Sequence, residues 1–232
     1  MRKLAVFLFL SLLRLISRTF WRMERSWVGD TRPETAFQGL RVVALLNHTS
    51  LFEWLFIGAC PYAFLWRVAE HGVIPAAEKT TRRPLVGLFF KMLGQHVVSV
   101  TRERDSTWRS VLQRIDPDSM VIIAPEGRMK RPNGLDSQGQ PMSVRGGIAD
   151  ILEAVPAGPM LIAYSGGLHH VQAPGERFPR PFRTIRIAIE RLDIGEYRSA
   201  RLAEAGAPAG FKRAVVTDLD RRRDRHCPTS PT

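Results

Sequence analysis

Short apolar runs alternate with longer amphipathic runs along the middle of this chain. Short runs of apolar residues between polar or turn-forming residues are typical of buried strands, and longer runs with apolar residues three and four positions apart are typical of helices. This pattern predicts strands at residues 41–46, 64–69, 96–101, 120–124, 160–165 and 184–192. It predicts helices at residues 51–59, 84–93, 106–115 and 144–154.

The order of these elements indicates the fold class. Strands that alternate with helices are typical of an α/β domain with a largely parallel sheet. We therefore expect a single α/β domain over residues 28–218, with a mostly parallel twisted sheet flanked by helices. In such sheets, functional sites collect beyond the carboxyl ends of the strands.

The segment before this domain is apolar and basic at once. Residues 4–13 are almost wholly apolar, but this run is shorter than the roughly 20 residues that a spanning helix needs. Arg14, Arg18, Arg22 and Arg25 then recur at helical spacing. We expect residues 1–27 to form an amphipathic helix that lies in the membrane interface, with its arginines at anionic head groups.

The same N-terminal residues have two alternatives to an interfacial helix. A single tilted anchor, with arginines that reach back to the interface, fits the same residues. A secretory signal fits poorly because no small-residue cleavage site follows the apolar run. The expected location is the cytoplasmic face of the cell membrane, either peripheral or held by the N-terminal segment.

Composition narrows the classes of partner. The chain has 232 residues and a formal net charge of +12, which suits nucleic acid, anionic lipid or phosphate-rich substrates. Its arginines do not interleave with aromatic residues on one face, so no nucleic-acid partner is expected. Two cysteines, Cys60 and Cys227, form no disulfide framework or metal-binding spacing. Residues 219–232 are basic and are predicted to be a disordered tail.

The richest chemistry follows the first predicted strand of the domain. His48 comes directly after residues 41–46, and Glu53 lies five positions further on. A carboxylate at one ring nitrogen fixes the histidine tautomer and makes the ring a better general base. The two side chains meet only if His48 lies in a turn and Glu53 in the first helical turn. Alternatively, Ser50 and Glu53 form a capping box and His48 is an ordinary strand-end residue.

Other candidates follow later strands. The turn at Pro125, Glu126, Gly127 and Arg128 exposes two opposite charges after an apolar strand. Arg128 would bind a phosphate in fork geometry, and Glu126 would accept a hydrogen bond from a hydroxyl or position that arginine. Arg102, which follows the strand at 96–101, is a further candidate phosphate ligand. The alternatives are a surface turn with a weak ion pair and an ordinary solvated arginine.

Taken in order, these segments resemble the glycerolipid acyltransferase family of the lysophosphatidic acid acyltransferase type. The resemblance covers roughly residues 40–170 and is carried by four segments: His48 before a carboxylate, Gly94 to Arg102, Pro125-Glu126-Gly127, and Val155-Pro156 with Pro159. Ser143 to Gly147, with Arg145, is similar to a further basic element of the family. The chain departs from the family in carrying Glu53 where aspartate is usual.

The resemblance implies an O-acyltransferase. Acyl-coenzyme A or acyl carrier protein would be the co-substrate, a lysolipid hydroxyl the acceptor, and no other cofactor would be needed. His48 would be the general base and Glu53 its orienting partner, while Arg102, Glu126, Gly127, Arg128 and Arg145 would bind substrate. The alternatives are an acyltransferase for a non-glycerol lipid and a lipid-binding protein without turnover. A metal hydrolase is the least favoured, because His169-His170 has no partner at helical ligand spacing.

Overall fold

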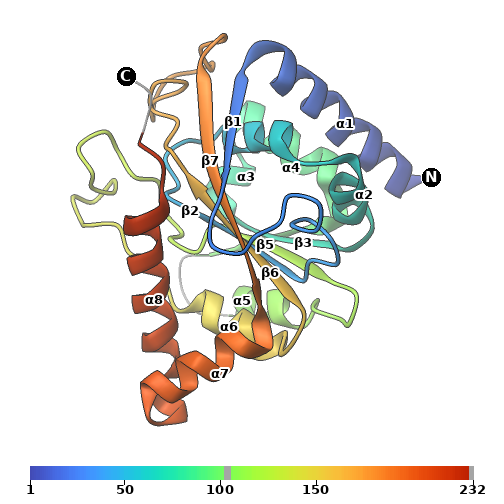
Figure 1. Cartoon of the computed structure of the whole chain (residues 1–232). Coiled ribbons are helices and arrows are strands. Elements are labelled where there is room, and N and C mark those ends of the chain that lie inside the picture. The colour runs from blue at the N-terminus through green and yellow to red at the C-terminus, as the bar shows by residue number, and fades with distance from the viewer. Residues whose placement is uncertain (102–105, 230–232) are drawn as a thin grey trace.

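The computed structural model of the chain describes residues 1–101 and 106–229. Its centre is a seven-stranded sheet in the order β1-β7-β6-β2-β5-β3-β4 (Figure 1). All paired strands are parallel except β6 and β7, which run antiparallel. The strands are β1 (Arg22–Trp27), β2 (Val42–Leu46), β3 (Gly72–Ala77), β4 (Val97–Val100), β5 (Met120–Ile123), β6 (Pro159–Ser165) and β7 (Thr184–Asp193).

Helices cover both faces of the sheet. The main ones are α1 (Arg2–Phe20), α2 (Tyr62–His71), α4 (Pro84–Leu93), α5 (Ser106–Leu112), α6 (Gly147–Ala154), α7 (Ile194–Ala205) and α8 (Phe211–His226). Shorter turns of helix are η1 (Glu53–Ala59), α3 (Glu78–Thr81), η2 (Gly94–His96) and η3 (Pro208–Gly210). Figure 1 shows α1, α2 and α4 on one side of the sheet and α5, α6 and α8 on the other.

The central strands alternate strictly between these two layers, because successive side chains of a strand point to opposite faces. In β6, Met160, Ile162 and Tyr164 pack into the core beneath α5, α6 and α8. Leu161 and Ala163 point to the opposite side, towards α1, η1 and α2. We call these the α6 face and the α1 face of the sheet.

The α/β class and the mostly parallel sheet predicted from the sequence are confirmed. The strand predicted at 64–69 is wrong, because these residues lie in α2. Phe64, Leu65, Val68 and Ala69 are buried, and their spacing is that of one helical face rather than one strand face. The strand next to α2 is β3, whose Gly72 and Pro75 weaken the strand pattern.

Both ends of the chain differ from the sequence prediction. The N-terminal helix ends at Phe20, and residues 22–27 form the edge strand β1 instead of continuing that helix. Residues 219–226 belong to α8 and are not a disordered tail. Helix α8 is strongly polar, but Phe211, Val215 and Leu219 recur every four residues and are buried against the α6 face.

Two of the arginines predicted to lie at lipid head groups have internal partners. Arg14 donates from Nε to the carbonyl of Cys60 at 2.7 Å and stacks over the ring of Tyr62. Arg25 donates to the carbonyl of Ala59 at 3.1 Å. These carbonyls lie at the C-terminal end of η1, where helical carbonyls lack partners within the helix. Of the helices in the described part of the chain, none combines the length and apolarity needed to cross a membrane.

Candidate active site

The loop that follows β2 has an unusual backbone. Asn47 has a φ of 64°, a left-handed conformation that asparagine adopts more readily than most residues other than glycine. Its side-chain Nδ2 donates to the carbonyl of Ser165 at the end of the neighbouring strand β6, at 2.8 Å. The loop is thus fastened to the sheet at its first residue, and it turns His48 out of the line of β2.

His48 and Glu53 meet as the sequence pattern required. His48 lies in the loop, Glu53 is the first residue of η1, and the Nδ1 atom of His48 is hydrogen-bonded to Oε2 of Glu53. The other oxygen of Glu53 accepts from the backbone N–H groups of Thr49, at 2.6 Å, and Ser50, at 3.4 Å. Glu53 therefore orients the histidine and also closes the loop. Ser50 is not the N-cap that the capping-box alternative required, because Phe52 precedes η1 and the Oγ of Ser50 accepts from the N–H of Phe52.

The surroundings of His48 favour the charged form of its ring. Burial alone would lower the pKa of His48. The charge of Glu53, its hydrogen bond to the ring and the charge of Glu126 together outweigh burial, so the pKa of His48 is raised above 6.5. A raised pKa makes the neutral ring a stronger base, as proton abstraction from a hydroxyl requires.

Glu126, predicted to contact substrate, lies outside the lining of the cavity beside His48. The residue is only 2% exposed, and its carboxylate accepts from the backbone N–H of Asn47 at 3.1 Å and of His48 at 2.7 Å. Burial raises the pKa of Glu126, while these hydrogen bonds and the charge of Arg223 oppose the rise. Glu126 thus supports the loop from beneath, and its ion pair is with Arg223, whereas Arg128 pairs with Asp136.

A cavity of about 870 Å³ opens beside His48, on the α1 face of the sheet. His48, Glu53 and Arg128 line one part of it, and the rest is mostly apolar. Most of the apolar lining comes from the sheet and from η1, α2 and α4, and includes Val43, Leu45, Phe56, Phe64, Phe89, Phe90, Leu161 and Ala163. Trp108 of α5 and Gly147 of α6 also border the cavity, from the α6 side. The volume and the apolar lining suit a ligand with a long hydrocarbon chain and a polar end.

The predicted arginines divide into three cases. Arg128 and Arg145 line the cavity together with Gly127, whose φ of 65° lets the backbone turn there without a side chain. Arg128 also pairs with the buried carboxylate of Asp136, and this pairing holds the pKa of Asp136 at about 2. Arg145 donates to the carbonyl of Glu126 at 3.2 Å. Arg102 lies outside the described residues.

Sequence reasoning missed several residues that build this site. Ser50 is buried and hydrogen-bonded to the buried Gln172, and the Oγ1 of Thr49 accepts from the N–H of Leu168 at 2.8 Å. Both partners, Gln172 and Leu168, lie in the loop after β6, where no residue pattern predicts a functional site. Asn47 does carry a usable signal, because asparagine tolerates the left-handed backbone that a turn after a strand can require.

Comparisons with known proteins identify the family and the fold. Residues 29–164 match the model of the family described as Acyltransferase. The fold is similar to the crystal structure of the 1-acyl-sn-glycerophosphate (LPA) acyltransferase PlsC from Thermotoga maritima, with a TM-score of 0.57 and 16% sequence identity. That match covers 93% of this chain and 78% of the PlsC chain. No curated protein sequence matches the chain.

Proposed function

This chain belongs to the acyltransferase family, and on that premise we propose that it moves a fatty acyl group from acyl-coenzyme A or acyl carrier protein to a hydroxyl of a lysophospholipid-type acceptor. One observation carries the proposal: the His48–Glu53 pair lies at the wall of a large, mostly apolar cavity. The pair supplies a base, and the cavity supplies room for an acyl chain. The similarity in fold to an LPA acyltransferase supports this acceptor class.

In the proposed reaction, His48 takes the proton of the acceptor hydroxyl at Nε2, the ring nitrogen opposite the one that Glu53 engages. The oxygen then attacks the thioester carbonyl, the C–S bond breaks, and the proton passes to the thiolate that leaves. Glu53 stabilises the charged imidazole during transfer. The N–H of Ser50 already donates to Glu53, so the N–H of Leu51, which lines the cavity, is the better candidate donor to the oxyanion.

The acceptor phosphate would bind at the polar end of the cavity. Arg128 and Arg145 both line this end, and guanidinium groups suit phosphate oxygens. The pairing of Arg128 with Asp136 leaves part of the guanidinium fork for a ligand, because only Nη1 engages the carboxylate. Arg102 is retained as a third candidate phosphate ligand on sequence grounds alone.

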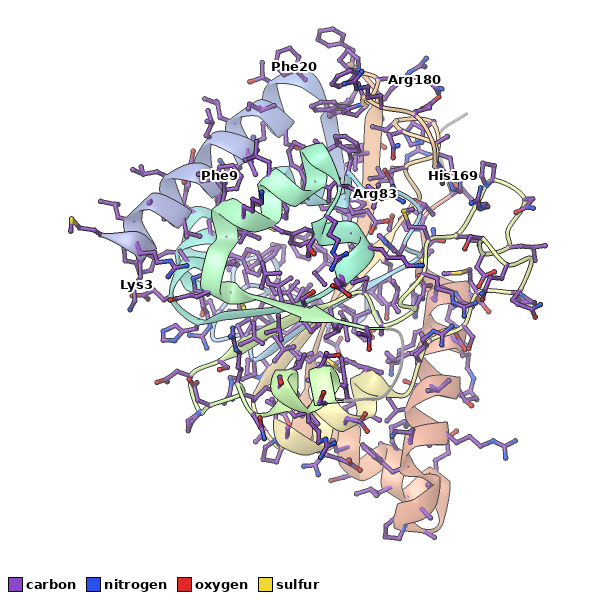
Figure 2. The ribbon with its side chains drawn as sticks, turned by 180° about the vertical axis from the view of Figure 1, so that it is seen from behind. Lys3, Phe9, Phe20, Arg83, His169 and Arg180 are labelled. Atoms are coloured by element: carbon purple, nitrogen blue, oxygen red, sulfur yellow. The ribbon has the colours of Figure 1, made fainter. Side chains whose placement is uncertain are left out.

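We also propose that the α1 face docks on a membrane. Helix α1 buries Val6 and Leu10, yet its outer side exposes Leu4, Leu8, Leu12 and Leu15, each more than half exposed. Figure 2 shows α1 along one side of the molecule, from Lys3 to Phe20, with Phe9 next to α4. Exposed Tyr62, Trp66, Leu88 and Met92 on α2 and α4 extend the apolar surface. An apolar surface of this extent on a basic protein suits an anionic lipid surface.

The decisive experiment measures thiol release from acyl-coenzyme A with a panel of lysolipid acceptors. It compares wild type with His48→Ala and Glu53→Gln. The glutamine keeps an oxygen for the N–H groups of Thr49 and Ser50 but places an amide where Oε2 accepts from His48. We expect wild type to turn over and both variants to be folded and almost inactive.

Other outcomes lead to different conclusions. A Glu53→Gln variant as active as wild type would show that Glu53 only closes the loop, and the proposed mechanism would be wrong. If wild type releases no thiol from acyl-coenzyme A, the assay is repeated with acyl carrier protein as donor. If both donors fail, and the protein still binds lysolipid, the non-catalytic lipid-binding function replaces the proposed one.

A further inference from the structure

The carboxylate beneath the histidine loop has a partner from the far end of the chain. Arg223 of α8 places Nη1 3.4 Å from Oε1 of Glu126. Arg223 is itself well held, because Asp220 and Asp224 accept from its guanidinium at 2.8 Å and 2.9 Å and the carbonyl of Met142 accepts at 3.2 Å. Its side chain is only 12% exposed. An arginine fixed in this way can balance a buried carboxylate without moving.

Glu126 needs such a partner because of where it lies. An ionised carboxylate that is almost fully buried is costly unless it is paired and hydrogen-bonded. Its ionised form is also the useful one, since it accepts from the N–H groups of Asn47 and His48 through separate oxygens. A protonated carboxyl group would carry a donor in place of one acceptor, and one of the two N–H groups would lose its partner.

We propose that Arg223 is a positioning residue for acyl transfer: its guanidinium pairs with Glu126, and Glu126 holds the backbone of Asn47 and His48 so that the His48 ring stays at the cavity. The proposal rests on the function proposed above for His48. It extends the site beyond residues 29–164, the part that matches the family, to the last helix of the described chain. Arg223 lies behind Glu126 and outside the cavity lining, so it acts through the loop and not on substrate.

The direction of the pH effect follows from the neighbouring charges. The groups around the Glu126 carboxylate are His48 from the loop, Arg145 from the segment before α6, and Asp220, Arg223 and Cys227 from α8 and its end. Without Arg223, the pKa of Glu126 rises further, because the main opposing side-chain charge is lost. If Glu126 stays ionised, its less compensated charge raises the pKa of His48 instead. Where Glu126 stays ionised, the acid limb of kcat/KM therefore moves to higher pH. Where Glu126 becomes protonated, kcat falls because the loop loses an acceptor.

The test compares wild type, Arg223→Gln and Arg223→Lys, with Arg213→Gln as the control. Arg213 is exposed near the start of α8, so its replacement removes the same charge from the same helix. We expect Arg223→Gln to lower kcat by about 10- to 100-fold, as for a displaced catalytic group, with KM nearly unchanged and the acid limb at higher pH. Lysine restores the charge and most of the activity, and Arg213→Gln behaves as wild type.

A second measurement separates this inference from the proposed function. The titration of the His48 ring, followed by NMR and assigned with His48→Gln, reports the loop whether or not acyl transfer is detected. A changed His48 titration in Arg223→Gln supports the positioning role even if the proposed reaction fails. If the variant merely melts at a lower temperature, with the acid limb and the His48 titration as in Arg213→Gln, Arg223 is structural only and the proposal is wrong.

Discussion

The two faces of the sheet have the same hydrophobic pattern, but one packs into a closed core and the other borders a cavity. On the α6 face, alternate residues such as Val42, Ala44 and Ile162 are fully buried in a closed core. On the α1 face, Val43, Leu161 and Ala163 border a cavity of about 870 Å³. Strand alternation therefore shows which residues leave the solvent, but whether they pack together or surround a ligand depends on how closely the covering helices approach.

The largest expected difference between the faces is in the free energy of unfolding lost when a large buried side chain is shortened. Ile162→Ala on the α6 face should lower the free energy of unfolding by about 2–5 kcal/mol, because a closed core relaxes only partly around a deletion. Leu161→Ala, one residue away on the α1 face, should cost clearly less, since Leu161 already borders open volume. Urea unfolding of both variants measures the difference. Equal losses would mean that the α1 face is as tightly packed as the other.

The reverse substitutions sharpen the comparison. Ala44→Leu should overpack the closed face and lower the free energy of unfolding by about 1–3 kcal/mol. In Ala163→Leu, the larger side chain would enter the cavity, so the free energy of unfolding should be nearly unchanged. The variant should turn over long-chain acyl donors more slowly, with a smaller effect on short-chain donors. Thermal melts and activity across a donor series provide the measurement. An Ala163→Leu variant with an unaltered chain-length profile would place the acyl chain elsewhere.

A titratable ring can be compared on each face, and the two should respond differently to pH. His48 must be neutral to act as a base, so kcat/KM of wild type should fall as pH drops through its raised pKa, at a value above 6.5. On the α6 face, burial and the hydrogen bond to Glu190 raise the pKa of Tyr164, which stays neutral across this range.

Tyr164→Phe is the matched test of this difference. It should cost about 1–2 kcal/mol of stability through the lost hydrogen bond and leave the pH profile unchanged. A Tyr164→Phe variant with a shifted acid limb would connect the α6 face to the site. In that case the two faces would not be chemically separate.

The smallest expected effect concerns the outer side of the α1 face. Leu8→Gln and Leu12→Gln remove exposed apolar surface, so each should weaken binding to anionic vesicles by about 1 kcal/mol without changing the melting temperature. Leu202→Gln on α7, 38% exposed, is the control and should bind as wild type. Vesicle co-sedimentation measures binding. Equal binding by all variants would remove α1 from the membrane contact.

What the sequence could predict depended on the distance between interacting residues. The His48–Glu53 pair was predictable, because both residues belong to one strand–loop–helix segment. Glu126 was recognised as unusual but given the wrong role, since its partner N–H of His48 lies 78 positions away along the chain. Arg223 lies 97 positions from Glu126, in a polar segment whose buried apolar residues are few. Local chemistry leaves a signal in sequence, whereas contacts between distant segments leave almost none.

The pairing of the edge strand β1 has a consequence for the nascent chain during synthesis. Strand β1 pairs only with β7 in the described sheet, and Glu24 binds Arg186, which lies 162 positions later. During translation, β1 therefore leaves the ribosome long before its partner exists, and an unpaired strand is a template for aggregation. Arg22, Glu24 and Arg25 place charges along this short strand. We expect these charges to keep the nascent chain soluble until β7 arrives.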